Sequence, residues 1–309
     1  MVSELWKIEV KQETDPFLSR VIIAGDWNGS PKEAKALLES IYRKWPKGQK
    51  VKFLVTCGGF IEFDWPESIC QSVVEDNRKR DEVVKTLVED AKRCAETVLN
   101  NDLIKKFREC TEYITLGMDS YAERENLRKP HIELVLVFDL KNDLTPCLFW
   151  TGKSYPTLEQ QDGLVQINPS THFSIFSGEK TMVLGCHDLK VFDPRVYNRK
   201  NIKNSRKAII EELSNLVKKE SPTLILHHPH QTDCVEGKET AGEKAGKFSP
   251  GTWDRALKGL FRIIPQSSTY ASAGRYWNND KPVRCHIDKV LEKTKSCASI
   301  DFIIQKSKP

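Results

Sequence analysis

The chain has 309 residues, of which 39% are hydrophobic and 29% charged, so a sizeable core is possible and a disordered or fibrous chain is excluded. At roughly 150 residues per domain the length allows two domains, although a single α/β domain can reach this size. The 48 basic and 43 acidic residues are mixed along the chain and leave a net charge of +5, which predicts no nucleic-acid partner. The longest apolar runs, such as residues 134–138, fall far short of the ~20 residues of a membrane helix, so neither a membrane span nor a secretory signal is expected.

Nine cysteines are scattered through the chain without a C-x-x-C pair, at positions 57, 70, 94, 110, 147, 186, 234, 285 and 297. An odd number without paired spacing argues against a disulfide framework and against a zinc ribbon. We therefore expect a reducing, cytoplasmic setting in which most of these thiols are small buried hydrophobic groups.

Hydrophobic periodicity and turn residues divide the chain into strands and helices. Ser30 and Glu33 form a capping box around Pro31, which predicts a helix that begins there and ends near residue 46. Two further helices are predicted over residues 80–98 and 200–219. Strands are predicted at residues 20–25, 51–55, 113–118, 131–140, 146–150, 171–177, 181–185, 222–226 and 260–264. The polar stretch 232–250 predicts an exposed loop.

Several predicted strands are apolar on both faces, as in residues 134–138. Such strands must be covered on both sides, by helices or by a second sheet. We therefore expect a single α/β domain, a four-layer αββα sandwich over residues 18–305, with an N-terminal extension at residues 1–17.

A cysteine and a lysine follow predicted strands in positions that suit chemistry. Cys186 comes directly after a strand and Gly185, where a tight turn would push its sulfur out of the sheet. Attack on an amide or nitrile carbon needs a thiolate, and a cation or hydrogen-bond donor must then hold the developing negative charge. Lys153, which also follows a strand end, could supply that cation. The alternatives are a buried structural thiol and a solvated surface lysine.

With these motifs the chain resembles the nitrilase or carbon-nitrogen hydrolase superfamily, whose members use Glu, Lys and Cys on an αββα sandwich. The resemblance extends over most of the chain and is closest at residues 173–189, which include the elbow at 185–188. It implies a hydrolase without a cofactor or metal that cleaves an amide, carbamoyl or nitrile bond through a thioester on Cys186, with Lys153 stabilising the oxyanion. A small amide or nitrile substrate and a homodimer are implied in the same way.

The chain departs from the family at one catalytic position. Thr56 and Cys57 stand where the family has Pro-Glu at the end of the second strand, so the expected general base is missing. Proton transfer worth about 100- to 10,000-fold in rate would then have to come from another group. The candidates are Glu62, Asp64 and Glu159, of which Glu159 is preferred because it lies near the lysine in sequence.

Four other residues are expected around the substrate or behind the reacting groups. Asp188 is expected to hold a turn or an ion pair, and Cys57 either fills the core or lies near Cys186. Glu62 and His187 are expected to line the site.

Two other functions stay open. Segments 25–26, 185–188 and 227–230 contain residue types found in the metal motifs of calcineurin-like metallophosphoesterases, although Asp26 and His187 are much farther apart than in that family. A merely structural histidine cluster is the other interpretation of these segments. The missing glutamate favours instead a catalytically lapsed nitrilase-like protein that binds an amide-like ligand or a partner protein.

Overall fold

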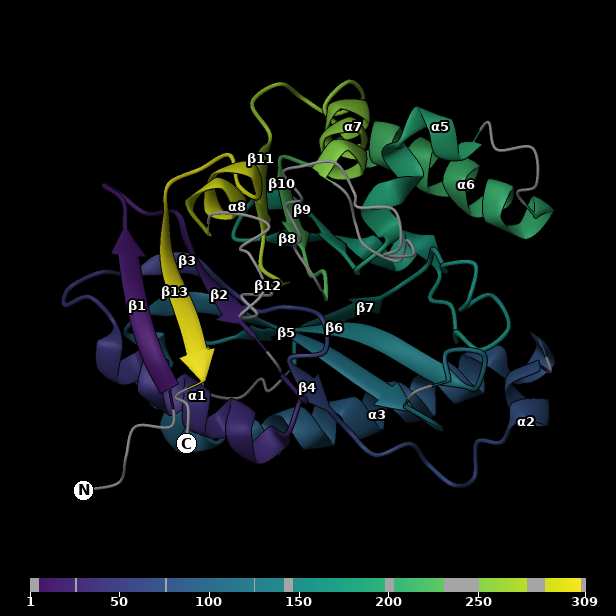
Figure 1. The fold of residues 1–309 in the computed structure, drawn as a ribbon, viewed down its shortest axis with the longest axis horizontal. Helices are drawn as coiled ribbons and strands as arrows, with labels where there is room; N and C mark the ends of the chain where they lie inside the picture. Colours follow the sequence, from purple (N-terminus) through teal and green to yellow (C-terminus); the bar gives the residue numbers. More distant parts are fainter. Residues whose placement is uncertain are drawn as a thin grey trace, which may run out of the picture.

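The structure is a computed structural model that describes residues 6–25, 27–75, 77–124, 126–141, 147–197, 203–230, 250–276 and 287–306. Two sheets lie face to face, and helices cover the outer face of each (Figure 1). The predicted four-layer αββα sandwich is therefore confirmed. None of the described helices is long and apolar enough to cross a membrane.

The larger sheet has the strand order β1-β13-β2-β3-β5-β6-β7, with β12 beside β2 and β4 beside β5. Its strands are β1 (Trp6–Gln12), β2 (Leu18–Ala24), β3 (Val51–Val55), β4 (Ile61–Glu62), β5 (Thr111–Tyr121), β6 (His131–Asp139), β7 (Phe149–Gly152), β12 (Arg275–Tyr276) and β13 (Ser299–Lys306). Neighbours from β13 to β5 pair in parallel, whereas β1, β6 and β7 are antiparallel to their partners.

The smaller sheet has the order β11-β10-β9-β8. Its strands are β8 (Phe173–Phe176), β9 (Glu179–Leu184), β10 (Leu224–His227) and β11 (Thr269–Ser272). The α-helices are α1 (Pro31–Lys44), α2 (Gln71–Glu75), α3 (Arg80–Val98), α4 (Asn101–Arg108), α5 (Pro194–Tyr197), α6 (Asn204–Glu220), α7 (Pro250–Leu260) and α8 (Ile287–Lys293). Three short 3₁₀ helices are η1 (Asn77–Lys79), η2 (Pro169–His172) and η3 (Asp188–Phe192).

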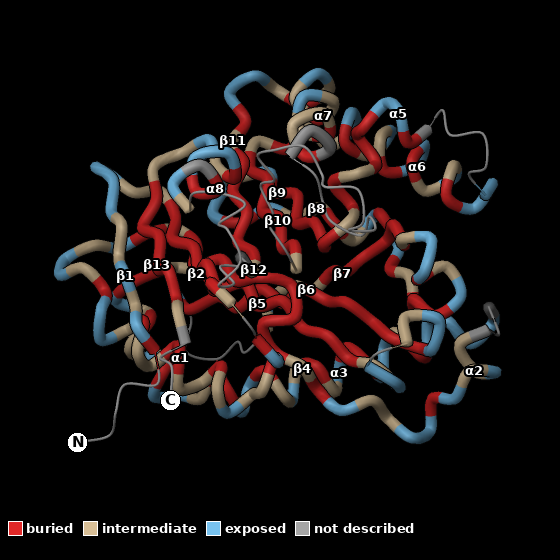
Figure 2. Tube along the Cα trace, in the orientation of Figure 1, coloured by how far each residue is buried: buried red, intermediate tan, exposed pale blue. Residues whose placement is uncertain are grey.

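Alternation of side chains along the strands produces three apolar cores. On β2, Leu18 and Ile22 face the smaller sheet and pack in a core with Val183, whereas Val21 and Ile23 join the core under α1, α3 and α4. The third core lies between the smaller sheet and helices α6 and α7. The strands are accordingly buried through most of their length, while the outer faces of the helices are exposed (Figure 2).

Most of the predicted elements are present. The Ser30 side chain caps α1 by accepting a hydrogen bond from the backbone of Glu33, with Pro31 in the first turn. The predicted helix over 80–98 is α3, and the predicted strand over 51–55 is β3. Other strand predictions overlap the observed strands, although β7 begins at Phe149, three residues after its predicted start, and β5 ends at Tyr121, three residues after its predicted end.

The predicted strand at residues 260–264 is wrong. Leu260 ends helix α7, and the residues after it form a turn before β11 begins at Thr269. Leu260 and Ile264 pack in the helix-side core with Trp253 and Ala256 of α7, so the apolar run belongs to a helical face. The predicted loop at 232–250 lies outside the described residues up to position 249.

Residues expected in an N-terminal extension form part of the sheet. Trp6–Gln12 is strand β1, which pairs with β13 along its whole length, from Trp6 opposite Lys306 to Gln12 opposite Ile300. Trp6 is buried and stacks near Trp27. This part of the extension therefore completes one edge of the larger sheet.

A fully buried arginine on β2 connects the two sheets. Arg20 Nε and Nη2 donate to the two carboxylate oxygens of Asp301 at 2.7 and 2.8 Å. Its other hydrogen bonds reach Thr294 Oγ1 at 2.8 Å and the carbonyl oxygens of Leu291 and Ser272 at 3.0 and 3.2 Å. All five N–H groups of the guanidinium thus have acceptors, which is what makes burial of this charge tolerable.

Candidate active site

The candidate site lies where strands of both sheets end. Lys153 follows the last residue of β7, and Cys186 follows β9 after one glycine. His230 comes three residues after β10, which pairs in parallel with β9 and brings their ends together. Asp119 on β5 and Glu133 on β6 are directly opposite each other in the sheet register.

Lys153 is held in a buried ion pair with Glu133. Its side chain is 1% exposed, and Nζ donates to Glu133 Oε1 and Oε2 at 2.7 and 3.0 Å and to Gln160 Oε1 at 2.6 Å. Burial alone would raise the pKa of Glu133, but the charges of Lys153 and His230 lower it to about 2. Burial would likewise lower the pKa of Lys153, but Glu133 and Cys186 hold it above its ordinary value. Both groups are therefore ionised at neutral pH.

Cys186 lies in a cationic environment. Its residue is 8% exposed, and the backbone N–H of His230 donates to its sulfur at 3.3 Å. Burial alone would raise the pKa of this thiol, but the charge and side-chain hydrogen bond of His230, together with the charge of Lys153, lower it below its ordinary value. The two residues singled out from the sequence therefore interact electrostatically, and this environment stabilises the thiolate of Cys186 relative to that of an ordinary cysteine.

His230 lies between two carboxylates. Its Nε2 is 2.6 Å from Asp119 Oδ2, and its Nδ1 is 3.6 Å from Glu133 Oε2. The Tyr121 hydroxyl donates to the same Asp119 oxygen at 2.8 Å. Burial opposes protonation of the imidazole, but Asp119, Glu133 and Cys186 raise the pKa of His230 well above its ordinary value. Two like charges on opposite residues of adjacent strands repel each other, and the imidazolium between them offsets that repulsion.

Asp188 ties the lysine loop to the cysteine loop. Its Oδ1 accepts hydrogen bonds from the backbone of Ser154 and Tyr155 at 3.0 and 2.8 Å, and its Oδ2 accepts one from Gly185 at 2.9 Å. Burial raises the pKa of this carboxyl group. A Cβ on Gly185 would lie 3.1 Å from Cα of Lys153, so the two loops touch at this glycine. Through these hydrogen bonds Asp188 holds the turn at Gly185 against the backbone that follows Lys153.

The carboxylates expected to replace the missing base are not the one that contacts Lys153. Glu159 and Asp64 are exposed, and the residue after Glu159, Gln160, is the one that bonds to Lys153. Glu62 is half-buried and forms an ion pair with Arg124 at 3.1 Å. The carboxylate in contact with the lysine is instead Glu133, which sequence reasoning missed.

The remaining predicted residues lie close to the cluster. Cys57 is fully buried, and burial raises the pKa of its thiol to about 12, so it behaves as a core group. His187 is half-buried, and burial together with the Lys153 charge keeps the pKa of its imidazole well below the ordinary value.

His227, the last residue of β10, and His228, which follows it, contact backbone carbonyl groups. His227 Nε2 is 3.1 Å from the carbonyl oxygen of Cys186, and His228 Nδ1 is 2.7 Å from that of Thr56. Burial lowers the pKa of His227 to about 4 and that of His228 to about 3, so both imidazoles are neutral. Over the described ranges, no group of three or more His, Cys, Asp or Glu side chains could hold a metal ion, and Asp26 lies outside those ranges. These contacts favour the structural interpretation of the histidine cluster.

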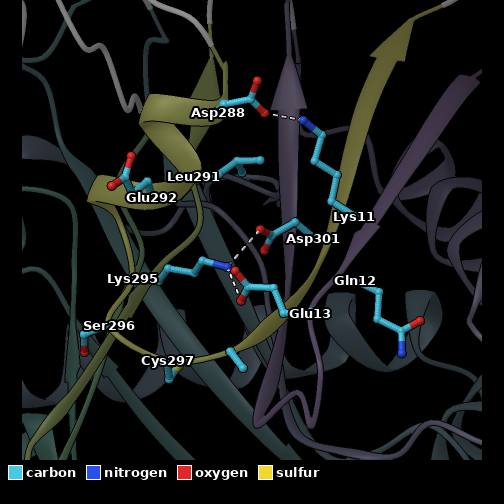
Figure 3. A pocket seen from close by; sticks show the side chains of 11 residues that line it. Lys11, Gln12, Glu13, Asp288, Leu291, Glu292, Lys295, Ser296, Cys297 and Asp301 are labelled. Atoms are coloured by element: carbon cyan, nitrogen blue, oxygen red, sulfur yellow. Dashed lines mark hydrogen bonds and ion pairs between the residues drawn. The ribbon is translucent and has the colours of Figure 1, made fainter.

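A surface pocket of about 670 Å³ lies away from this cluster, beside β1, β13 and α8 (Figure 3). Its charged side chains pair with one another. Lys295 reaches Glu13 at 2.5 Å and Asp301 at 3.7 Å, and Lys11 pairs with Asp288. Cys297 also lines this pocket, but burial raises the pKa of its thiol to about 11, so it is a weaker candidate nucleophile than Cys186.

A scan against protein-family models finds no match, and a search of curated proteins finds none either. Solved structures do match. One is a mutant of the amidase from Nesterenkonia sp. AN1 with the acetamide moiety of fluoroacetamide added covalently at its active-site cysteine. It is 12% identical, covers 86% of this chain and 78% of its own, and has a TM-score of 0.44.

Another mutant of the same Nesterenkonia enzyme, described as an amidase from the nitrilase superfamily, matches at 12% identity with a TM-score of 0.44, covering 85% of this chain and 78% of its own. The carbon-nitrogen hydrolase from Helicobacter pylori G27 matches at 12% identity with a TM-score of 0.42, over 83% of this chain and 73% of its own. Over most of its length the chain is thus similar, at low identity, to solved structures of two carbon-nitrogen hydrolases.

Proposed function

We propose that the chain is a thiol hydrolase that cleaves a non-peptide carbon-nitrogen bond, in an amide, a carbamoyl group or a nitrile, through a covalent intermediate on Cys186. The observation that carries this proposal is the cationic environment of the Cys186 sulfur, made by His230 and Lys153. A thiolate formed at neutral pH is the species that attacks an electrophilic carbon.

In the first step the sulfur adds to the substrate carbon, and negative charge develops on the substrate oxygen or nitrogen. Lys153 is the cation that we propose as the oxyanion stabiliser. Its three N–H groups, however, already donate hydrogen bonds to Glu133 and Gln160. It therefore acts through its charge, or by turning the N–H of its longest contact, 3.0 Å to Glu133 Oε2, toward the substrate. The amine leaves from the amide adduct to give a thioester, whereas the thioimidate formed by a nitrile reaches the same thioester by adding one water and losing ammonia. A further water then adds to the thioester carbon, the carbon–sulfur bond breaks and the acid leaves.

The test is the release of ammonia or amine from a panel of small amides, carbamoyl compounds and nitriles. Cys186→Ala should abolish release, whereas Cys57→Ala should keep most of it because Cys57 is a buried thiol with a raised pKa. Mass spectrometry of the protein after reaction with fluoroacetamide should show an adduct on the Cys186 peptide. Equal product release by the Cys186→Ala variant and the unmutated protein would overturn the mechanism.

A catalytically lapsed binding protein is the second candidate, because Cys57 stands where the resemblance calls for a glutamate. This candidate predicts that Cys186 fails to react with a thiol-directed electrophile at neutral pH while the folded protein still binds small amides. The lowered pKa of Cys186 favours the active enzyme over this alternative.

The setting and assembly belong to the same proposal. The described cysteines are all free, which suits the reducing, cytoplasmic compartment proposed for the protein. A second copy of the chain is the proposed partner, and sedimentation of the purified protein would distinguish a homodimer from a monomer.

A further inference from the structure

We propose that His230, oriented by Asp119, is the general acid and base of this site and takes the place of the glutamate absent at position 57. This inference rests on the proposed hydrolase function and names the group that moves the proton in it. The His230 backbone binds the Cys186 sulfur at 3.3 Å, and Asp119 Oδ2 holds ring atom Nε2 at 2.6 Å. Nδ1, which lies 3.6 Å from Glu133 Oε2, is then the ring nitrogen that Asp119 does not hold and that can exchange a proton.

The backbone that follows β3 leaves space for the imidazole of His230. A Cβ on Gly58 would lie 3.2 Å from Nδ1 of His230 and 2.7 Å from the carbonyl oxygen of His228. A Cβ on Gly59 would lie 2.6 Å from Asp119 Oδ2 and 3.2 Å from Cδ2 of His230. The two glycines that follow Cys57 thus leave room for the ring and its carboxylate, which side chains at these positions would crowd.

Other groups near the sulfur are poorly suited to carry the proton. Glu133 is bound by Lys153 through both oxygens and by Gln160 Nε2 at 2.6 Å, and its pKa of about 2 makes it a weak base. Cys57, with a pKa of about 12, is the opposite case, since it holds its proton throughout the neutral range. Glu159 is exposed. His230 contacts the sulfur through its backbone N–H, and its ring can both give and take a proton.

With His230 as the general acid and base, every proton transferred in an amide hydrolysis is accounted for. The resting pair is a thiolate on Cys186 and an imidazolium on His230. The sulfur adds to the carbonyl carbon, and the imidazolium gives its proton to the nitrogen, so that the carbon–nitrogen bond breaks and the amine leaves. Neutral His230 then takes a proton from water, the hydroxyl adds to the thioester carbon, and the carbon–sulfur bond breaks. The carboxylic acid leaves, and thiolate and imidazolium are restored.

Charged and titratable groups face His230 from several elements. Asp119 on β5 binds its ring, and Glu133 on β6 lies 3.6 Å from Nδ1. Lys153 after β7 and Cys186 after β9 complete the cluster, and Arg275 on β12 donates to the His230 carbonyl oxygen at 3.1 Å. The two carboxylates and the thiolate favour the imidazolium, and the cations oppose it. Removing the carboxylate of Asp119 therefore favours loss of the ring proton, and the alkaline limb of activity moves to lower pH.

The first experiment measures alkylation of Cys186 by iodoacetamide as a function of pH, by mass spectrometry of its peptide. This readout needs no substrate. His230→Gln should move the profile to higher pH because the thiolate loses its imidazolium, and Glu159→Gln should leave it unchanged because that side chain is exposed. An unchanged profile in His230→Gln would overturn the inference.

The second experiment measures turnover of an amide hydrolysed by the unmutated protein. His230→Gln should lower kcat by about 100- to 10,000-fold, Glu159→Gln should match the unmutated protein, and Asp119→Asn should shift the alkaline limb to lower pH. Added imidazole should partly restore the activity of His230→Gly, a rescue that a purely structural role would not give.

The two proposals fail in different ways. Product release by the unmutated protein that persists within about twofold in His230→Gln, with the same pH profile, overturns the role of His230 and leaves the hydrolase function intact. A shifted alkylation profile in His230→Gln without any turnover by the unmutated protein overturns the hydrolase function, and the catalytic role of His230 with it.

Discussion

The ion pair between Glu133 and Lys153 makes a measurable contribution to stability. Glu133 is 5% exposed, and its pKa falls from the ordinary 4.5 to about 2 in the folded protein. Because each pKa unit corresponds to about 1.4 kcal/mol, the charged form of Glu133 contributes about 3 kcal/mol to the free energy of unfolding above its unfolded pKa. Breaking a buried pair by removal of one partner typically costs about 3–5 kcal/mol, in agreement with this value. Glu133→Gln should therefore lower the free energy of unfolding by about 3 kcal/mol at neutral pH.

The pH dependence supplies the sharper test. Since the folded pKa is lowered, the contribution of Glu133 is present above 4.5 and is lost as pH falls toward 2. Urea unfolding followed by tryptophan fluorescence should show the unmutated protein and Glu133→Gln converging as pH is lowered through this interval, with Glu159→Gln as the exposed control. A loss below about 1 kcal/mol at neutral pH, or a difference that does not change with pH, would refute the reasoning.

Three further outcomes are expected. Asp301→Asn should lower the free energy of unfolding in urea by about 3–5 kcal/mol because it leaves the buried Arg20 without its opposite charge, and a loss below about 1 kcal/mol would contradict this. Asp188→Asn should lower kcat for an amide substrate at least tenfold, because an amide nitrogen cannot accept a backbone N–H and the two loops separate; unchanged kcat would show that the tie is dispensable. Iodoacetamide at neutral pH should label Cys186 in the folded protein and spare Cys57, as peptide mass spectrometry would show, and the reverse pattern would contradict the assigned thiol environments.

Local signals in the sequence were sufficient for much of the fold. The capping box at Ser30 and the uninterrupted apolar runs of the inner strands define elements without reference to the rest of the chain. The strand predicted at 260–264 failed because a short apolar run, interrupted here by Arg262, fits the end of a helix equally well. Strand β1 was missed although Trp6, Ile8 and Val10 alternate with charged residues, the pattern typical of an edge strand with one buried face.

The site depends on information that is not local. Cys186 and Lys153 could be found because each follows a strand end, but Glu133 lies beside Lys153 only through the register that pairs Leu134 with Gly152. A charge inside the otherwise apolar strand β6 was the signal available for it. His230 reaches the sulfur because β9 and β10 are neighbours, and a single sequence does not state which strands pair.

The carboxylate of Asp188 has a consequence for how the site reaches its working geometry. By accepting backbone hydrogen bonds from both loops, it makes the distance between sulfur and ammonium a property of the folded chain. Arriving substrate then need not order the two described loops that Asp188 joins, so little reorganisation energy is spent on these loops before reaction. Because Asp188 fixes the spacing of the two loops, the existing shape of the site should determine which substrates fit. Compounds that require the two loops to move apart should therefore be rejected.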